Sequence, residues 1–396
     1  MTSRRFSSKV AALAPSSTIA VARAARQLAA SGADVVDFGL GEPDFATPDF
    51  VGRAGAAAIE AGKTKYTDVA GDPALRDAIA EKYRREQGSE CRRENVLVTA
   101  GAKQAVFNAC ATLFQEGDEV ALFSPYWVSF PEMVRLSGAE PLFLECDFED
   151  GWPVRSKALE AAAGPRTRGV VVNSPNNPTG AVAAADEVVR IADWCARHDA
   201  YLIFDETYDR FLYDGRRHVS AASLAAPRDR IIVTGAASKT YAMTGWRLGW
   251  AVGPPDVIAA MAAYQSHSTS NASSISQAAV LAALQDRERT ERSVGEMLAE
   301  YARRREAMLG ALERIAGIRA VQPEGAFYAF ARVSGLFAAK GVSGSKQFCD
   351  RLLSEAHVAA VPGDAFGEDT CARFSFATSV DRIDEGMRRL AEWAAR

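Results

Sequence analysis

Seven short hydrophobic runs, separated by longer helical patterns, constrain the fold of this chain more than any other feature. They are rich in β-branched residues and lie between residues 94 and 253, reading NVLVTA, EVALF, EPLFL, GVVVN, YLIF, RIIVT and RLGWAVG. Strands that alternate with helices in this way form parallel sheets covered by helices on both faces. We therefore predict an α/β fold in which this stretch forms one wide, mainly parallel sheet of seven strands.

The segments around this stretch predict a second, smaller unit. Apolar residues recur at helical spacing between Asp286 and Ile315, which indicates a long amphipathic helix. Two strand-like segments follow, AFYAFARV and ARFSFA, with a helical pattern between them and another at the C-terminus. A chain of 396 residues has room for two domains of the usual ~100–200 residues. We predict a large domain over residues 50–288 and a small, discontinuous α+β domain over residues 1–49 and 289–396.

Composition and charge exclude several classes of partner. The net charge is -4 and the charges are interspersed, so we expect no nucleic-acid partner. No run reaches the ~18 apolar residues of a membrane span, and polar residues interrupt the first 22 residues, so we expect neither a membrane span nor an export signal. The six cysteines are scattered without a C-x-x-C pair, which favours a cytoplasmic protein. The four histidines have no second ligand at helical spacing, so we predict no metal site.

Lys239 is the candidate nucleophile among nine lysines. It lies in GAASKTYAMTGWRLGW, directly after the strand-like run RIIVT, in a loop of small residues. Most of the other lysines lie in charged helical or loop segments. A lysine at a strand end among small residues can reach a cofactor without obstruction. Taken alone, the position fits an ordinary loop lysine better, so the neighbouring motifs decide between the two interpretations.

Asp205 and Tyr208 form a second candidate pair, at the end of the run YLIF. In a cleft, the Asp205 carboxylate could keep a pyridine nitrogen protonated through a charge-assisted hydrogen bond. The Tyr208 phenol could donate to an oxygen on the same ring. Helix capping by Asp205 and core packing by Tyr208 account for the pair equally well.

Four further segments lie at the ends of predicted strands, where α/β sheets bind their ligands. NSPNNPTG contains turns that leave the amide of Asn177 available to a ring. TAGAKQ offers the backbone N–H groups of Gly101 and Ala102 to a phosphate at a helix start. SPYWV supplies the aromatic plane of Trp127, and GWRLG supplies the guanidinium of Arg247.

Together these motifs resemble the fold-type I, pyridoxal-5'-phosphate-dependent aminotransferases of classes I and II. The resemblance rests on SPNNPTG, the Asp205 to Tyr208 spacing and SKTYAMTGWRLG, and it extends in order through GLGEPDFATP, GKTKYTDVAG, PEGAFY and ARFSFA. It implies pyridoxal phosphate as the cofactor and a homodimer with shared active sites. TAGAKQAVFNAC and SPYWVSFPEMVRLSG are similar to the bacterial-type aspartate and prephenate aminotransferase subgroup.

The resemblance also implies a role for individual residues. Lys239 would be the Schiff-base lysine and the proton carrier, with Asp205 and Tyr208 as its catalytic partners. Tyr66 would reach the phosphate in the neighbouring subunit. The other residues implied to bind the cofactor are Gly101, Ala102, Trp127, Asn177, Ser238 and Arg247. Those implied to bind the substrate are Arg373, at its α-carboxylate, Lys103, at a distal carboxylate, and Thr18, Gly39, Asn177 and Trp127.

The predicted activity is transfer of an amino group from a dicarboxylic amino acid to a 2-oxo acid by a ping-pong route. FGLG at residues 38–41 is instead similar to the aromatic and kynurenine branch, which leaves that substrate class open. A carbon–sulfur lyase or a ring-forming synthase would share Lys239, Asp205 and Arg373 but would have little use for Lys103. A cofactor-binding regulator would carry an N-terminal DNA-binding domain, whereas here the aminotransferase pattern begins almost at once.

Overall fold

One large sheet organises the molecule. The computed structural model describes residues 7, 10, 13, 17–224 and 228–396. Its seven-stranded sheet has the order β2-β8-β7-β6-β5-β3-β4, and of these strands β8 alone runs antiparallel to its neighbours. The strands are β2 (Val96–Thr99), β3 (Glu119–Ser124), β4 (Glu140–Glu145), β5 (Thr167–Asn173), β6 (Tyr201–Asp205), β7 (Ile231–Ala236) and β8 (Gly249–Val252). The predicted α/β fold, with a wide and mainly parallel sheet, is confirmed.

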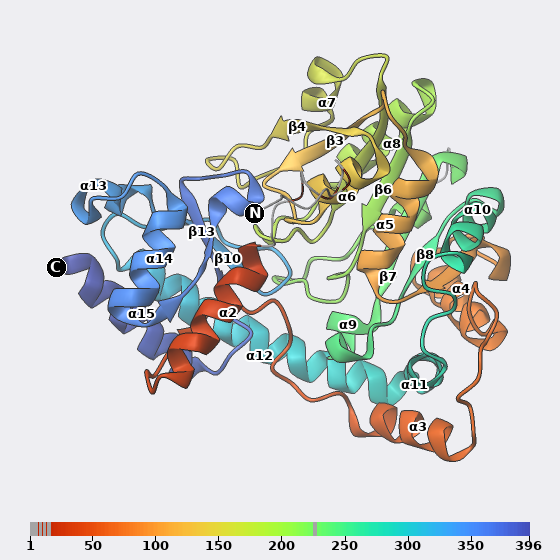
Figure 1. Ribbon diagram of the computed structural model, residues 1–396, viewed down its shortest axis with the longest axis horizontal. Coiled ribbons are helices and arrows are strands. Elements are labelled where there is room, and N and C mark those ends of the chain that lie inside the picture. Colours follow the sequence, from red (N-terminus) through yellow and green to blue (C-terminus); the bar gives the residue numbers. More distant parts are fainter. Residues whose placement is uncertain (1–6, 8–9, 11–12, 14–16, 225–227) are drawn as a thin grey trace, which may run out of the picture.

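Helices cover both faces of this sheet (Figure 1). Ile203 of β6 belongs to one core cluster, whereas its neighbours Leu202 and Phe204 belong to another, because successive side chains of a strand point to opposite faces. The helices of the first cluster are α5 (Ala102–Leu113), α6 (Phe130–Ser137) and α10 (Pro255–Ser266). Those of the second include α4 (Pro73–Gln87), α7 (Ser156–Ala162), α8 (Ala185–Arg197) and α11 (Ser274–Gln285), and α3 (Asp49–Glu60) packs on α11.

Two smaller sheets lie beside the large one. A four-stranded sheet has the order β12-β13-β10-β9, and its strands are β9 (Arg319–Ala320), β10 (Tyr328–Arg332), β12 (Val361–Pro362) and β13 (Cys371–Ser375). The second sheet pairs β1 (Val36–Asp37) with β11 (Val358–Ala359) in parallel, which joins an early segment to a late one. The helices around these sheets are α2 (Ser17–Ala30), α12 (Arg287–Glu313), α13 (Phe337–Lys340), α14 (Ser345–Ala356) and α15 (Val380–Ala395).

The predicted long helix corresponds to α12, and the two predicted strand segments correspond to β10 and β13. The two-residue strands of the small sheets were not predicted. Most of the segment on which the export-signal prediction rests lies outside the described residues. Within the described part of the chain, no helix is long and apolar enough to cross a membrane. The same residues contain no group of three or more His, Cys, Asp or Glu side chains that could hold a metal ion.

Candidate active site

A cavity of about 350 Å³ opens at the carboxyl ends of the parallel strands. Asn173 ends β5, Asp205 ends β6 and Ala236 ends β7, and all three residues line this cavity. Of the residues predicted from the sequence, all but Gly101 and Tyr66 line it too. They are Thr18, Gly39, Ala102, Lys103, Trp127, Asn177, Asp205, Tyr208, Ser238, Lys239, Arg247 and Arg373.

Lys239 lies on the short helix α9 (Ala237–Thr240), which follows β7 directly. Its Nζ donates a hydrogen bond of 2.5 Å to the backbone carbonyl of Gly41. Burial lowers the pKa of Lys239 to about 8, and the cations Arg373 and Arg247 act in the same direction. About a tenth of this amine is therefore neutral at pH 7, far more than for an ordinary lysine, and the neutral amine is the nucleophilic form.

Asp205 is a buried carboxylate at the end of β6. Its Oδ1 accepts hydrogen bonds from the backbone N–H of Thr207 at 3.0 Å and from the Thr207 hydroxyl at 2.7 Å. Burial raises the pKa of Asp205 to about 6, because the charged form is poorly solvated there, and the bonds from Thr207 oppose the shift. A cationic partner in the cavity would stabilise the ionised form.

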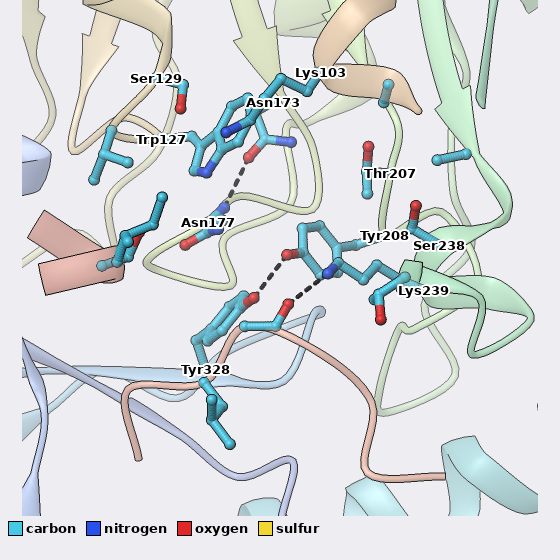
Figure 2. A pocket seen from close by; sticks show the side chains of 18 of the residues that line it. Lys103, Trp127, Ser129, Asn173, Asn177, Thr207, Tyr208, Ser238, Lys239 and Tyr328 are labelled. Carbon is cyan, nitrogen blue, oxygen red and sulfur yellow. Dashed lines mark hydrogen bonds between the residues drawn. The ribbon is translucent and has the colours of Figure 1, made fainter. Parts of the chain in front are cut away.

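Tyr208 meets a tyrosine that sequence reasoning did not single out. The hydroxyls of Tyr208 and Tyr328 lie 2.7 Å apart, and both rings are buried (Figure 2). Tyr328 begins β10 of the four-stranded sheet and lines the same cavity. The motif PEGAFY ends at Tyr328, so the signal was present in the sequence, but nothing in the motif indicates that this hydroxyl would reach Tyr208.

Arg373 contributes a buried guanidinium from β13. Its Nη1 donates to Oδ1 of Asn177 at 2.8 Å, and its Nη2 donates to the carbonyl of Gly39 at 2.9 Å. The guanidinium also lies 4.4 Å from the ring centroid of Tyr328. Among the described residues, its Nε has no hydrogen-bond partner and no carboxylate forms an ion pair with it. Arg373 is thus a buried cation whose charge is not matched by a paired anion.

The start of α5 forms a cradle suited to an anion. Gly101 caps this helix with φ of 88°, and among the described residues no side chain bonds to the N–H groups of Ala102 and Lys103. A Cβ at Gly101 would lie 2.7 Å from Nη2 of Arg247, so glycine allows the guanidinium to approach the helix start. Gly101 therefore lies behind Arg247 rather than on the cavity wall. Ala102, Ser238 and Arg247 line the cavity itself, and a helix N-terminus beside an arginine attracts phosphate.

Lys103 is the second residue of α5 and lies at the cavity rim. Its Nζ lies 4.9 Å from the ring centroid of Trp127, a cation–π contact. Partial burial, followed by the charge of Arg247, lowers the pKa of Lys103. Thr18 lines the cavity from α2. Lys103, Trp127 and Thr18 therefore border the same space.

Tyr66 lies apart from this cavity. It is 89 % exposed, the most exposed of the large hydrophobic side chains described. The structure therefore does not bring Tyr66 to the site in its own chain. An exposed aromatic side chain of this kind is available to a second chain.

The residues around the cavity fit pyridoxal phosphate. Lys239 supplies a buried amine for the aldehyde carbon, and Asp205 supplies a buried carboxyl for the pyridine nitrogen. The cradle at the start of α5 supplies N–H groups and the Arg247 charge for the phosphate. The charge of Arg373, which no carboxylate among the described residues pairs with, and the second N–H on each of its Nη atoms leave capacity for a carboxylate ligand beside the cofactor. Such a site is typical of an enzyme that acts on amino acids.

Comparison with known proteins identifies the family. The family described as aminotransferase class I and II matches residues 33–390. The chain belongs to the class I and II aminotransferase family. It is therefore an aminotransferase of fold type I, with pyridoxal phosphate as its cofactor.

Individual relatives are similar over nearly their whole length. An aspartate aminotransferase of Geobacillus stearothermophilus is 38 % identical over 387 residues, which cover 98 % of each chain. An aspartate/prephenate aminotransferase of Thermus thermophilus is 43 % identical and is covered in full, with 99 % of this chain aligned. The solved structure of aspartate aminotransferase from Thermus thermophilus with maleate matches with a TM-score of 0.94 and 41 % identity, covering 98 % of this chain and 100 % of that one.

Proposed function

We propose that this aminotransferase takes its amino group from a dicarboxylic amino acid, aspartate or glutamate, and transfers it to a 2-oxo acid. The observation that carries this proposal is that Arg373 and Lys103 both line the cavity that holds Lys239, in addition to Arg247 at the phosphate cradle and Arg26. A dicarboxylic substrate carries two anionic groups, one for Arg373 and one for Lys103. The similar Thermus thermophilus enzyme was solved with maleate, which is also a dicarboxylate. Prephenate and arogenate are further candidates, since the Thermus thermophilus relative described above is named for aspartate or prephenate.

In this proposal the cofactor lies between the strand ends and the start of α5. Ala102, Ser238 and Arg247 hold the phosphate. Gly101, whose own N–H donates to the carbonyl of Thr99, allows Arg247 to approach the start of α5. Asp205 pairs with the pyridine nitrogen, and Trp127 packs against the ring. Tyr208 and Asn177 bond to the ring hydroxyl, and Tyr328 supports the Tyr208 hydroxyl at 2.7 Å.

When bound, pyridoxal phosphate supplies an aldehyde carbon that exchanges amines and a ring that accepts electrons. Asp205 holds a proton at the ring nitrogen, which maintains the ring's capacity to accept electrons. Lys239 would hold the cofactor through its Nζ, and the same amine, once freed by a substrate amine, would be the base that carries the proton of the substrate α-carbon. The same residues serve both half-reactions, and the second half-reaction reverses the first with a different substrate. This gives ping-pong kinetics.

Arg373 binds the α-carboxylate of the substrate in this scheme. Its anchoring by Asn177 and Gly39 fixes the plane of the guanidinium, and a planar fork binds a carboxylate better than a point charge. Lys103 faces the distal carboxylate at the rim. Thr18 and Trp127 lie where the substrate side chain would pass.

The active enzyme in this proposal is a cytoplasmic homodimer. The exposed Tyr66 reaches the phosphate in the partner's site, so each site needs both chains. The large domain extends over residues 50–288, and the small one combines residues 1–49 and 289–396. Pairing of Val36 with Val358 supports this discontinuous small domain.

A half-reaction screen tests the substrate class. Purified enzyme loaded with cofactor is mixed with each amino acid, and loss of the visible absorbance of the lysine-bound cofactor is followed without any 2-oxo acid. We expect aspartate and glutamate to react fastest at equal concentrations. A faster reaction with phenylalanine or kynurenine than with either of them would contradict the dicarboxylate proposal and favour the aromatic branch.

A further inference from the structure

A buried lysine lies behind the active site, outside the cavity. Lys82 of α4 is 4 % exposed, although its charged helix suggests a solvent-facing side chain. Its Nζ lies 2.9 Å from Oε2 of Glu86 and 3.0 Å from Oδ2 of Asp209. A buried ammonium is tolerated only when it is paired in this way. The ammonium of Lys82 therefore holds two carboxylates, and the more buried of the two is that of Asp209.

That carboxylate, Asp209, connects two segments that are far apart in the sequence. While Oδ2 contacts Lys82, Oδ1 accepts a hydrogen bond of 3.3 Å from the hydroxyl of Thr240. Asp209 directly follows Tyr208, and Thr240 directly follows Lys239. One carboxylate thus ties the turn after β6, which presents Tyr208, to helix α9, which presents Lys239.

The surroundings favour the ionised form of Asp209. Burial alone would raise the pKa of Asp209, but the nearby charges of Lys82 and His218 outweigh it and hold the pKa below its usual value. Hydrogen bonds to an ionised acceptor are stronger than those between neutral groups. The bond from Thr240 to Asp209 therefore benefits from the charge pair with Lys82.

We propose that Asp209, held by the buried ammonium of Lys82, is a positioning residue that fixes Lys239 relative to Tyr208 through the hydroxyl of Thr240. The inference rests on the proposed role of Lys239. Lys82, Asp209 and Thr240 do not line the cavity. Their effect on the site is therefore transmitted through the backbone of α9 and of the turn after β6. Without the bond, α9 can shift against the turn, and the amine is then less precisely placed for proton transfer.

The test compares Thr240→Val with Thr240→Ser in the enzyme loaded with cofactor. Valine keeps the shape of threonine but removes the donor, whereas serine keeps the donor. Thr290→Val is the matched control. The Thr290 hydroxyl is also buried, and it donates a hydrogen bond from α12 to the carbonyl of Ala283 on α11, in another part of the molecule. For each variant we would measure kcat, KM, the melting temperature and the visible circular dichroism of the bound cofactor, which reports the geometry of the link to Lys239.

We expect Thr240→Val to lower kcat roughly tenfold with little change in KM, since the loss of a hydrogen bond to a charged group is of that order. The visible dichroism should weaken, and Thr240→Ser should restore both. Thr290→Val should lower the melting temperature comparably and change neither readout. Lys82→Met should reproduce the effects of Thr240→Val.

Two outcomes would overturn the inference. In one, Thr240→Val has unchanged kcat and dichroism while Lys239→Ala is inactive, so the proposed function stands and the positioning role does not. In the other, Thr290→Val alters kcat and dichroism as strongly as Thr240→Val. The bond from Thr240 to Asp209 would then contribute only to the overall stability of the protein. An active Lys239→Ala variant would reject the proposed function separately, whatever the Thr240 variants do.

Discussion

The guanidinium of Arg373 donates a hydrogen bond of 2.8 Å to the side-chain carbonyl of Asn177, although 196 residues separate the two in the sequence. Asn177 follows β5 of the seven-stranded sheet, whereas Arg373 lies in β13 of the four-stranded sheet. The bond therefore joins the two sheets at the wall of the cavity. A carboxylate bound by Arg373 would contact both parts of the molecule at once.

Arg373→Lys should weaken every amino-acid substrate to a similar extent. All of them carry an α-carboxylate, and lysine cannot keep the bonds to Asn177 and Gly39 while presenting a planar fork. We expect kcat/KM to fall by about one to two decades, the scale of a lost charge-assisted hydrogen bond. Measuring kcat/KM for aspartate and alanine checks this. If only aspartate were affected, Arg373 would have to be reassigned to the distal carboxylate.

Lys103→Ala should alter the choice between substrates. Aspartate loses a contact between its distal carboxylate and the ammonium, whereas alanine or phenylalanine has no such group to lose. We expect the ratio of kcat/KM for aspartate over that for a neutral amino acid to fall by roughly one to two decades. A ratio that stays within about twofold would remove the main support for a dicarboxylic substrate.

Asp205→Asn should stabilise the cofactor-free protein at alkaline pH. The pKa of Asp205 is raised from 3.8 to about 6 in the folded chain, so its stabilising contribution is present at low pH and is lost as the pH rises through about 6. At pH 8, where the buried carboxylate is ionised, this shift lowers the free energy of unfolding by about 3 kcal/mol relative to low pH. In thermal unfolding of the two apoproteins, Asp205→Asn should melt at a higher temperature than the wild type at pH 8. This difference in melting temperature should shrink toward pH 5. A difference independent of pH would contradict this account.

Attachment of the cofactor to the apoprotein should depend on pH through Lys239. Its pKa of about 8, compared with 10.5 for an ordinary lysine, means that the neutral amine predominates above pH 8. The rate of attachment, followed by the visible absorbance after rapid mixing, should rise toward pH 8 and then level off. A rate that climbs steadily to pH 10 would show that Lys239 titrates as an ordinary lysine.

The sequence was informative wherever a local pattern determines the structure. Each of the seven hydrophobic runs forms a strand of the large sheet. All but the partly exposed edge strand β4 are largely buried, and a strand covered by helices on both faces needs a continuous apolar run. Asp205 was recognisable because it directly follows the run YLIF, and Lys239 because it lies in the short segment after RIIVT. The ends of parallel strands meet at one edge of the sheet.

Features that depend on contacts between distant segments were not predictable. Lys82 resembles any lysine in a charged helix, and its burial follows only from the placement of Asp209 against α4. The bond from Tyr208 to Tyr328 joins residues 120 positions apart. The pairing of Val36 with Val358 likewise involves strands of two residues, too short to leave a periodic pattern.

The most direct test of the central claim is the turnover of Lys239→Ala, measured with aspartate and 2-oxoglutarate beside the wild type. Lys157→Ala, which replaces an exposed lysine at the start of α7, is the control for the loss of a lysine. Removing a general base costs a factor of ~10² to 10⁴, and losing the covalent attachment of the cofactor adds to it. We therefore expect no measurable turnover from Lys239→Ala, with melting temperature and oligomeric state unchanged and Lys157→Ala fully active. If Lys239→Ala retained more than about a tenth of the wild-type rate without added amines, a loss far smaller than expected for a general base, Lys239 would not be the catalytic lysine.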